Sequence, residues 1–401
     1  MESIKKQCED VQEYIIEVRR QLHQIPEIGI DIPKTQAFIC NELEKMGIPY
    51  EKNTATKDGV ADCGIIALIE GKNTDKVLAL RADMDALPVK EMNDVSYCSV
   101  HDGCMHACGH DAHMSMLLGA AKVLQANKNL LNGSVKLLFQ SGEEIVAGSK
   151  LLIEGGCLEN PKVTACYGTH VWPVDPDVHP TGQVVVKKDC MMASGDRFVI
   201  RIKGKGCHGS MPHTGIDPII AATQVISALQ YISSREVDGN DSHVLSICQI
   251  HSGSCWNVIP DDAFIEGTFR TKSVETRAYY TKRIEEITKN ICVALRCECT
   301  VEWMDGAPPV LNDHAMTDLV VQAGKKILGE DGITENYEGS MATEDFANYQ
   351  EKVPGVFVFL NIANKEKNTN VALHNPRFQV DESVLWRGAA LAVQTALDYL
   401  S

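Results

Sequence analysis

Met-His-Ala-Cys-Gly-His-Asp-Ala-His, residues 105–113, is the stretch around which the rest of the chain is organised. It places Cys108, His110 and two further histidines within nine residues. Thiolate and imidazole are preferred ligands of borderline-soft divalent cations, and Cys108 and His110 can reach one centre from a turn that enters a helix. Hydrogen-bonded surface turns have similar compositions, so partners elsewhere in the chain decide whether this stretch binds metal.

The length and composition indicate a two-domain protein. A chain of 401 residues is too long for one ordinary core, and its 44% apolar content is enough for two. The formal net charge of -16, without a basic run, argues against nucleic acid and anionic membranes as partners. We find no signal peptide or membrane span, and fifteen irregularly spaced cysteines indicate a reducing cytoplasm rather than a disulfide framework.

Alternating strand and helix patterns predict an α/β core for the first part of the chain. Helical spacing opens the sequence, and Gly47 is placed to cap a helix over 35–46. Strands are predicted at 63–69, 76–80, 135–139 and 163–168, with helices from 109 and at 150–154. Sites in such cores form where strands end. The polar residues at these ends are Asp83, Asp85, Glu143, Glu144 and His170.

A different pattern begins near Gly182. Its predicted strands are 197–203, 244–250, 263–270 and 297–303, and its helices are 217–233 and 275–295. This βαββαβ order is typical of a ferredoxin-like domain. The first alternation resumes near Asp313. The prediction is therefore an α/β protein of two domains, in which a split metal-binding catalytic domain (1–184 and 307–401) carries an inserted ferredoxin-like α+β lid domain (185–306).

Other catalytic motifs receive little support. Gly204-Lys-Gly-Cys-His-Gly209 matches a dinucleotide fingerprint, but Met211-Pro212 follows it instead of a helix. The sequence contains no phosphate-binding Gly-x-x-x-x-Gly-Lys-Ser/Thr loop, no Gly-x-Ser-x-Gly elbow and no His-Glu-x-x-His helix. Phosphoryl transfer and serine hydrolysis therefore lose their main support.

Nine ordered segments carry a resemblance that covers essentially the whole chain. They are Arg81-Ala-Asp-Met-Asp-Ala-Leu-Pro88, residues 105–113, Gly142-Glu-Glu144, Gly168-Thr-His170, Gly204-Lys-Gly-Cys-His208, Asn257-Val-Ile-Pro260, Gly267-Thr-Phe-Arg270, Glu344-Asp-Phe346 and Leu373-His374. The sequence resembles the dinuclear metallohydrolases that include aminoacylase and glutamate carboxypeptidase. It is most similar to the branch of hippurate hydrolases and indoleacetyl-amino-acid hydrolases.

The resemblance implies five ligands for two divalent metal ions, Mn²⁺ or Zn²⁺: Cys108, His110, Glu144, His170 and His374. Many relatives have His-x-Asp where this chain has Asp83-Met-Asp85. Asp83 is then a ligand, a partner that orients an imidazole, or neither, and we favour the orienting role. Whether Asp111 binds metal is also open. His106 and His113 are more often structural histidines, because a helix start needs polar partners.

The resemblance also implies the catalytic and substrate-binding residues. Glu143 is the general base, with Asp85 or Asp111 as the substitute if Glu143 is not, and Asp85 is included among the catalytic residues. His208 stabilises the oxyanion and contacts substrate. Asn257 and Arg270 match the residues that bind the free carboxylate of an acylated amino acid, a task that suits the Arg fork.

The sequence thus predicts a metal-dependent amidohydrolase that cleaves small N-acyl amino acids to a carboxylic acid and a free amino acid. The enzymatic alternative is a dipeptidase or carboxypeptidase acting on short peptides. The alternative of another class is an inactive metal- or ligand-binding relative. The resemblance adds a homodimer formed through the lid domain, with closure of the two domains around the substrate and His208 acting in a neighbouring subunit.

Overall fold

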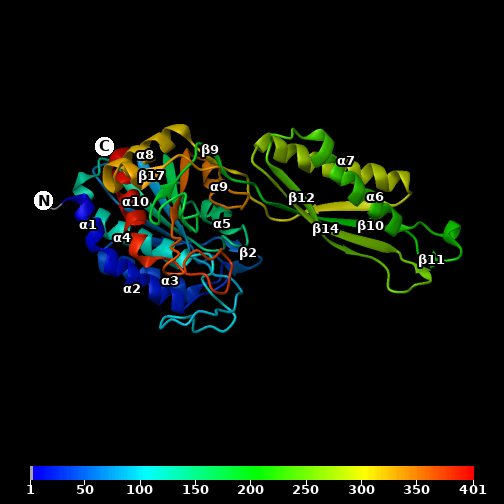
Figure 1. Ribbon diagram of the computed structural model, residues 1–401, viewed down its shortest axis with the longest axis horizontal. Helices are drawn as coiled ribbons and strands as arrows, with labels where there is room; N and C mark the ends of the chain where they lie inside the picture. The colour runs from blue at the N-terminus through cyan, green and yellow to red at the C-terminus, as the bar shows by residue number, and fades with distance from the viewer. Residues whose placement is uncertain (1–2) are drawn as a thin grey trace. The chain divides into compact units, whose positions relative to one another are not determined.

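The computed structural model describes residues 3–401, which form two compact units (Figure 1). The larger unit comprises Met1–Met191, Leu311–Gly339 and Asp345–Ser401, and the inserted unit comprises Met192–Val310 and Ser340–Glu344. The predicted boundaries at 184/185 and 306/307 lie a few residues before these divisions. The segment Ser340–Glu344, which the sequence had assigned to the catalytic domain, belongs to the inserted unit.

An eight-stranded mixed sheet forms the centre of the larger unit, in the order β1-β4-β6-β5-β7-β18-β8-β17. The strands β5, β6, β7 and β18 are mutually parallel. Every residue of β5, β6 and β18 is buried, which explains their nearly continuous apolar sequences. The bounds are β1 (Tyr50–Lys52), β4 (Ile65–Ile69), β5 (Val77–Asp83), β6 (Ser134–Gln140), β7 (Ala165–Trp172), β8 (Val184–Val185), β17 (Ile333–Thr334) and β18 (Gly355–Asn361).

Helices cover this sheet, so the predicted α/β class is confirmed. The longer helices α4 and α10 pack on β5 and share one large apolar core with α2 and α8, whereas the short helices α5 and α9 lie against β6 and β18. Gly47 ends α3 in the left-handed conformation, as predicted. The helices are α1 (Ile4–Asp10), α2 (Gln12–Gln24), α3 (Pro33–Met46), α4 (His110–Ala126), α5 (Gly148–Glu154), α8 (His314–Leu328), α9 (Ala347–Gln350) and α10 (Leu385–Tyr399).

The inserted unit has the predicted βαββαβ order. Its antiparallel sheet runs β12-β14-β10-β15, and α6 and α7 lie together on one face of it (Figure 1). A two-stranded ribbon of β11 and β13 continues beyond the paired ends of β10 and β14. The bounds are β10 (Asp196–Lys203), β11 (Cys207–His208), α6 (Pro218–Tyr231), β12 (His243–His251), β13 (Val258–Ile259), β14 (Asp262–Thr271), α7 (Val274–Ala294) and β15 (Glu298–Trp303).

Some predicted bounds are wrong. The strand β7 continues through His170 to Trp172, so His170 lies within a strand rather than after it. The short helix α9 begins at Ala347, directly after the segment Glu344-Asp-Phe346. The remaining short elements are β2 (Thr56–Lys57), β3 (Val60–Ala61), η1 (Lys128–Leu130), β9 (Asp189–Met192), η2 (Pro212–Thr214), η3 (Ile232–Glu236), β16 (Val310–Asn312), η4 (Glu330–Gly332) and η5 (Glu382–Val384).

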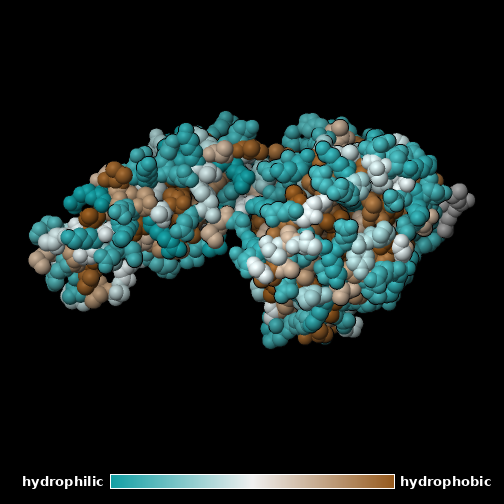
Figure 2. All heavy atoms as spheres, turned by 180° about the vertical axis from the view of Figure 1, so that it is seen from behind, coloured by the Kyte–Doolittle hydropathy of each residue, from teal (hydrophilic) through white to brown (hydrophobic). Residues whose placement is uncertain are grey.

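The surface is mostly hydrophilic, with separate apolar patches on both units (Figure 2). Among residues 3–401, no helix is both long and apolar enough to cross a membrane.

Candidate metal centre

Cys108 and His110 lie at the entry to α4, which begins at His110 after Gly109 has adopted a left-handed conformation. Both side chains are buried. The Cys108 Sγ atom lies 3.5 Å from Nε2 of His170. The chain therefore brings a thiol and two imidazoles together from a turn and a strand that are far apart in sequence. Cys108, His110 and His170 form one of the compact groups of potential metal ligands.

Glu143 and Glu144 follow β6 and face the same centre. Their carboxylate oxygens each lie 3.9 Å from Nε2 of His110. Asp85 holds this turn, because its two carboxylate oxygens accept hydrogen bonds from the backbone N–H groups of Glu143 (3.0 Å) and Glu144 (3.1 Å). The same Asp85 carboxylate lies 3.5 Å from Nδ1 of His110. Asp85 thus fixes the two glutamates relative to His110.

His170 and His374 complete the group. Nδ1 of His170 donates to the carbonyl of Val171 (2.6 Å), which leaves Nε2 unprotonated and facing Cys108. Nε2 of His374 lies 3.4 Å from Oε1 of Glu144. The backbone of His374 has a φ of 64° and donates to the carbonyl of Ala107 (2.8 Å). Such left-handed conformations are uncommon outside glycine, so the surrounding structure holds His374 beside Cys108.

Asp83 lies in a compact group with His110 and His113, and both of its carboxylate oxygens have strong partners. Its Oδ2 atom accepts from Arg81 (2.8 Å) and its Oδ1 atom from Nδ1 of His113 (2.5 Å). Arg81 also donates to Asp345 (2.9 Å) and Gln140 (3.0 Å), all within the buried interior. Because both carboxylate oxygens are bonded, this geometry favours the orienting role over the ligand role for Asp83.

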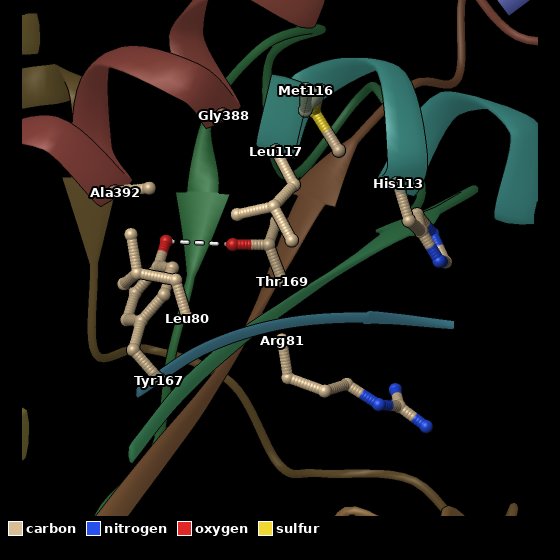
Figure 3. A pocket seen from close by; sticks show the side chains of 9 residues that line it. All are labelled: Leu80, Arg81, His113, Met116, Leu117, Tyr167, Thr169, Gly388 and Ala392. Atoms are coloured by element: carbon tan, nitrogen blue, oxygen red, sulfur yellow. Dashed lines mark hydrogen bonds between the residues drawn. The ribbon is translucent and has the colours of Figure 1, made fainter. Parts of the chain in front are cut away.

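His113 is a satisfied histidine, in keeping with the structural role expected for it. The backbone N–H of Val171 donates to Nε2 of His113 (2.8 Å), so the proton of the neutral ring is on Nδ1 and points to Asp83. His113 also borders a cavity of about 20 Å³ between the sheet and helices α4 and α10, where Thr169 donates to the hydroxyl of Tyr167 (Figure 3). This space suits one water molecule and is too small for a substrate.

The other two polar residues of the opening stretch belong to none of the compact groups of potential ligands found among residues 3–401. Asp111 forms an ion pair with Nε of Arg19 and accepts from Nδ1 of His23, both at 2.7 Å, and both partners lie on α2. His106 is buried, and neither of its ring nitrogens has a hydrogen-bond partner within residues 3–401. The expectation of polar partners for His106 is therefore wrong. Burial lowers its pKa to about 3 and keeps the ring neutral.

The centre is strongly electronegative. Burial and the nearby Glu144 and Glu143 carboxylates raise the pKa of the Cys108 thiol well above its ordinary value of 9.0. Burial alone would lower the pKa of His110, but Asp83, Asp85 and Glu144 outweigh it and raise the pKa to about 10. A divalent cation would compensate this excess of negative charge and displace the proton from both groups.

The residues present fit two divalent cations. Both ring nitrogens of His110 and Oε1 of Glu144 are buried without a hydrogen-bond partner anywhere in residues 3–401, and such atoms require an explanation. The donor set of thiolate, imidazole and carboxylate is one that borderline divalent metals prefer. Two of the compact groups contain Cys108: Cys108 with His110 and His170, and Cys108 with Glu144 and His374.

The remaining predicted site residues lie in the inserted unit. His208 is exposed on β11, and its Nδ1 atom accepts from the backbone N–H of Ser210 (3.1 Å). A neutral His208 therefore carries its proton on Nε2 and presents it as a donor. Asn257 immediately precedes β13, and its carbonyl accepts from the N–H of Gly209 (2.8 Å). Pairing of β11 with β13 thus brings His208 and Asn257 together.

Arg270 is in the four-stranded sheet of the inserted unit, at the end of β14 away from the β11–β13 ribbon. It pairs with Val244 near the end of β14, and its Nη1 donates to the hydroxyl of Thr343. From Asp262 to Phe269, next to Arg270, β14 pairs with β10 along its whole length, which spans roughly 23 Å at about 3.3 Å per residue. His208 and Asn257 lie beyond the Asp262 end. The closeness of Asn257 and Arg270 in sequence therefore does not make them neighbours in space.

Comparison with known proteins identifies the class. A profile of peptidase family M20/M25/M40 matches residues 79–398. The chain belongs to this family of hydrolases, which act on amide and peptide bonds.

Individual relatives agree with this assignment. The chain is 40% identical over 386 residues to an N-acetyl-L-cysteine deacetylase of Bacillus subtilis, covering 96% of this chain and 88% of that protein. It is 38% identical over 395 residues to IAA-amino acid hydrolase ILR1-like 4 of Arabidopsis thaliana, covering 98% and 87%. A crystal structure of a dinuclear metal-binding peptidase of the M20 family from Bacillus subtilis superposes with a TM-score of 0.82 at 35% identity, over 98% of this chain and 99% of that one.

Sequence reasoning missed the residues that bond to Asp83 and Asp111. Arg81, Gln140 and Asp345 bond one another around Asp83, and Arg19 and His23 hold Asp111. Arg81 and Asp345 belong to two of the motifs that carry the family resemblance. Their place in these motifs was a signal, although the sequence assigned neither residue a role. Nothing in the local sequence connects α2 with Asp111, which follows it by almost ninety residues.

Proposed function

We propose that the chain is a metal-dependent amidohydrolase that cleaves N-acyl amino acids to a carboxylic acid and a free amino acid. The observation that carries this proposal is the convergence of Cys108, His110, His170 and Glu144 beside Glu143, with buried candidate ligand atoms that lack a hydrogen-bond partner within residues 3–401. The two curated relatives are named for the removal of an acetyl group from cysteine and of an indoleacetyl group from amino acids. Both reactions break an amide bond beside a carboxylate.

Five residues would hold the cations: Cys108, His110, Glu144, His170 and His374. When bound, two divalent cations polarise the scissile carbonyl and make water a stronger acid. Manganese and zinc are the proposed metals, because thiolate and imidazole favour zinc whereas carboxylates tolerate manganese.

Glu143 is the proposed general base. It is buried at the end of β6, and its carboxylate lies on the same side of His110 as that of Glu144. A carboxylate in this position can take a proton from the attacking water and pass it to the leaving amine. Asp85 keeps Glu143 in place through the backbone N–H that it accepts, so we assign Asp85 a positioning role within the catalytic set.

His208 is the proposed donor to the oxyanion. Its Nδ1 atom already accepts from Ser210, so the Nε2–H group is the one available to a developing negative charge. Asn257, which the β11–β13 ribbon holds beside His208, would bind the substrate together with it.

Arg270 is the proposed partner of the substrate carboxylate. Its side chain is half-buried, and burial lowers the pKa of its guanidinium. A planar fork that is already partly desolvated suits bidentate binding of a carboxylate.

The separation within the inserted unit supports a homodimer. A small N-acyl amino acid is too short to contact both Arg270 and His208 of one chain across roughly 23 Å of sheet. Two copies would supply one residue each. The surface around the β11–β13 ribbon is also unusually apolar, with Trp256 94% exposed and Val258 51% exposed, and exposed apolar side chains of this kind mark protein contacts.

The compartment proposed is the cytoplasm. All fifteen cysteines are free thiols, including the exposed Cys248 and Cys255, which suits a reducing environment.

Two other functions remain to be distinguished from this one. A dipeptidase or carboxypeptidase would use the same centre on a short peptide, and the similar solved structure is described as a peptidase. An inactive ligand-binding relative would retain the fold without turnover. Glu143 and the five ligand residues are all retained here, which favours an enzyme.

The test is a side-by-side assay of the metal-loaded protein. The substrates are N-acetyl, N-benzoyl and N-indoleacetyl derivatives of one amino acid, together with dipeptides that carry the same C-terminal residue. We expect a higher kcat/KM for at least one acyl derivative than for every dipeptide. Preference for dipeptides would replace the proposal by the peptidase function, and no turnover of any substrate would favour the inactive relative.

A further inference from the structure

Cys292, Cys297 and Cys299 lie close together where α7 leads into β15 in the inserted unit. The buried residues of α7 recur every four positions, as Tyr280, Ile284, Thr288 and Cys292. After the helix, Arg296 adopts a left-handed conformation with a φ of 65°, and the N–H of Cys297 donates to the carbonyl of Cys292 (2.8 Å). This cap turns the chain from the end of α7 directly into β15.

Cys299 faces the same core as Cys292. The residues of β15 alternate between exposed and half-buried, and Cys299 is one of the half-buried ones. It pairs with Ile202 of β10, which is buried, and paired residues of neighbouring strands point to the same face of a sheet. Cys292 and Cys299 therefore both point between α7 and the sheet, where they pack on one apolar core.

The thiols of Cys292 and Cys299 interact directly. Burial raises the pKa of the Cys292 thiol to about 12, and the charge of Cys299 and a side-chain hydrogen bond with Cys299 add to this effect. Cys292 thus stays protonated and is the donor of the pair. The thiol of Cys297 instead lies 3.9 Å from the carbonyl oxygens of both Asp217 and Leu295.

Cys299 can also be reached from solvent. The strand β15 is at the edge of its sheet, and no further strand among residues 3–401 pairs with its outer side. A groove of about 620 Å³ is lined by side chains of α7 and β15, among them Lys289 and Cys299. A small polar oxidant can therefore reach Cys299, whereas Cys292 has no exposed surface.

This arrangement suits a disulfide better than a metal ion. The three thiols do not form one of the compact groups of potential metal ligands found among residues 3–401. A disulfide needs only two sulfur atoms that can approach each other, and Cys292 and Cys299 already interact. All three cysteines are free thiols in this structure.

We infer that Cys292 and Cys299 form a reversible disulfide when the protein meets a peroxide, which makes this pair a redox modification site of the inserted unit. The sulfur of Cys299 attacks one peroxide oxygen and the O–O bond breaks, which gives a sulfenic acid and one water. The sulfur of Cys292 then attacks the sulfenic sulfur, the S–O bond breaks, and a second water leaves with the proton of Cys292.

The overall reaction is balanced. The two thiols lose two electrons and two protons, and hydrogen peroxide is reduced to two waters. A small thiol such as glutathione reverses the modification by thiol–disulfide exchange and is itself oxidised to a disulfide. Transient disulfides of this kind are compatible with the proposed cytoplasmic location.

The test uses the full-length protein in its native state. The protein is treated with hydrogen peroxide, remaining thiols are alkylated, and the chain is cleaved with trypsin without reduction. Cleavage after Lys289 and Arg296 separates Cys292 from the other two cysteines. We expect mass spectrometry to find peptides 290–296 and 297–325 joined with the loss of two hydrogen atoms, and dithiothreitol to separate them.

Single variants assign the partners. Cys292→Ser and Cys299→Ser should each lose the linkage, whereas Cys297→Ser should keep it. Cys248→Ser removes an exposed thiol on β12 and is the matched control, which should also keep the linkage. In Cys292→Ser, dimedone should label Cys299, because its sulfenic acid then has no thiol to resolve it. Circular dichroism checks that each variant is folded.

Three outcomes would overturn the inference. The first is oxidation of Cys248 in the wild type while Cys292 and Cys299 stay reduced. The second is a linkage that persists in Cys299→Ser, which would assign it to Cys297. The third is a linkage that forms only in urea, where the folded contact is lost. If Cys292→Ser does not fold, the wild type and Cys299→Ser still decide. None of these readouts depends on hydrolysis, so the inference stands or falls separately from the proposed function.

Discussion

The two groups of predicted site residues differ in how completely one chain holds them. In the larger unit Cys108, His110 and His170 are buried, and the neighbouring carboxylates of Asp83 and Asp85 accept from side-chain and backbone donors. In the inserted unit His208 is exposed, and its ring bonds only to nearby Ser210 among the contacts described for residues 3–401. Arg270 lies in the four-stranded sheet, at the end of β14 away from the β11–β13 ribbon that carries His208.

This difference indicates two kinds of dependence. The metal centre depends on long-range packing within a single chain, because strands and a helix entry must meet before the ligands converge. In the inserted unit, each predicted site residue lies on or directly before a strand of its own. His208 and Arg270 of one chain, however, are too far apart to contact one small substrate together. We therefore expect changes in the larger unit to act within a subunit and changes at His208 to depend on a second subunit.

Removal of the cations should have the largest effect. Because five ligands converge only in the folded chain, a chelator should abolish hydrolysis, and Mn²⁺ or Zn²⁺ should restore it. Activity and metal content, the latter by elemental analysis, are measured on the same samples. Full activity in a protein shown to be metal-free would contradict a catalytic metal centre in the larger unit.

Glu143→Gln should be next in size. The amide retains the shape of the side chain but cannot accept a proton, so kcat should fall by roughly 100-fold or more while metal stays bound. Glu154→Gln, on the exposed end of α5, is the control and should keep wild-type turnover. An unchanged kcat in Glu143→Gln would move the base to Asp85, because Asp111 is ion-paired with Arg19.

His208→Ala tests whether the inserted unit acts on another subunit. Loss of an oxyanion donor should lower kcat by about 100-fold. Mixing Glu143→Gln subunits with His208→Ala subunits should then restore activity, because one site of each mixed dimer has both residues. If native mass spectrometry finds mixed dimers and activity does not return, His208 acts within its own chain or not at all.

Cys108→Ser should affect metal binding more than folding. Even partners outside the ligand set are worth about 10- to 100-fold in affinity, so loss of a ligand should weaken metal binding by at least about tenfold. Competition with a fluorescent chelator measures the affinity, and thermal melting without metal measures the folding. The same metal content and rate as the wild type would remove Cys108 from the ligands.

The smallest expected effect is on stability, and it concerns the ionised carboxylate of Glu91. Burial opposes ionisation of Glu91, but bonds from His23 and the N–H of Ser99 outweigh it and hold its pKa at about 2, below the ordinary 4.5. The folded protein therefore binds fewer protons than the unfolded chain between these values. The stability that Glu91 contributes is present above about pH 4.5 and is lost as the pH falls toward 2.

Glu91→Gln should accordingly lower the free energy of unfolding at pH 7 by about 1 to 2 kcal/mol, a value reduced for solvent screening. Its stability should also depend less on pH below 4.5 than that of the wild type. Glu13→Gln, exposed on α2, is the control. Urea unfolding at several pH values provides the measurement, and equal pH dependence of wild type and Glu91→Gln would contradict the prediction.

Local sequence was sufficient for the elements and for the composition of the site. The helix end at Gly47, the buried strands and the βαββαβ order follow from periodicity and capping, which act over a few residues. The ordered motifs also identified the family, because they specify residue types at strand ends and do not require coordinates.

Contacts between distant segments could not be predicted in this way. Whether Asp83 is a ligand or an orienting residue depends on its bonds to Arg81 and His113. The ring of His113 is in turn oriented by the N–H of Val171. His106 and His113 look equivalent in the sequence, yet only His113 is bonded within residues 3–401. Periodicity says which face a residue is on but not which partner it meets there.

The sequence by itself determined the α/β class and the inserted ferredoxin-like pattern, since these depend on residue types and short-range spacing, and its resemblance to a known family supplied the candidate ligands. Only the tertiary structure decided that Asp85 fixes Glu143 and Glu144, that Asp83 is bonded to Arg81 and His113, and that Arg270 lies far from His208. Each of these depends on strand register and on loops that meet from distant parts of the chain. Register is set by the packing of whole faces against a core, which no short stretch contains.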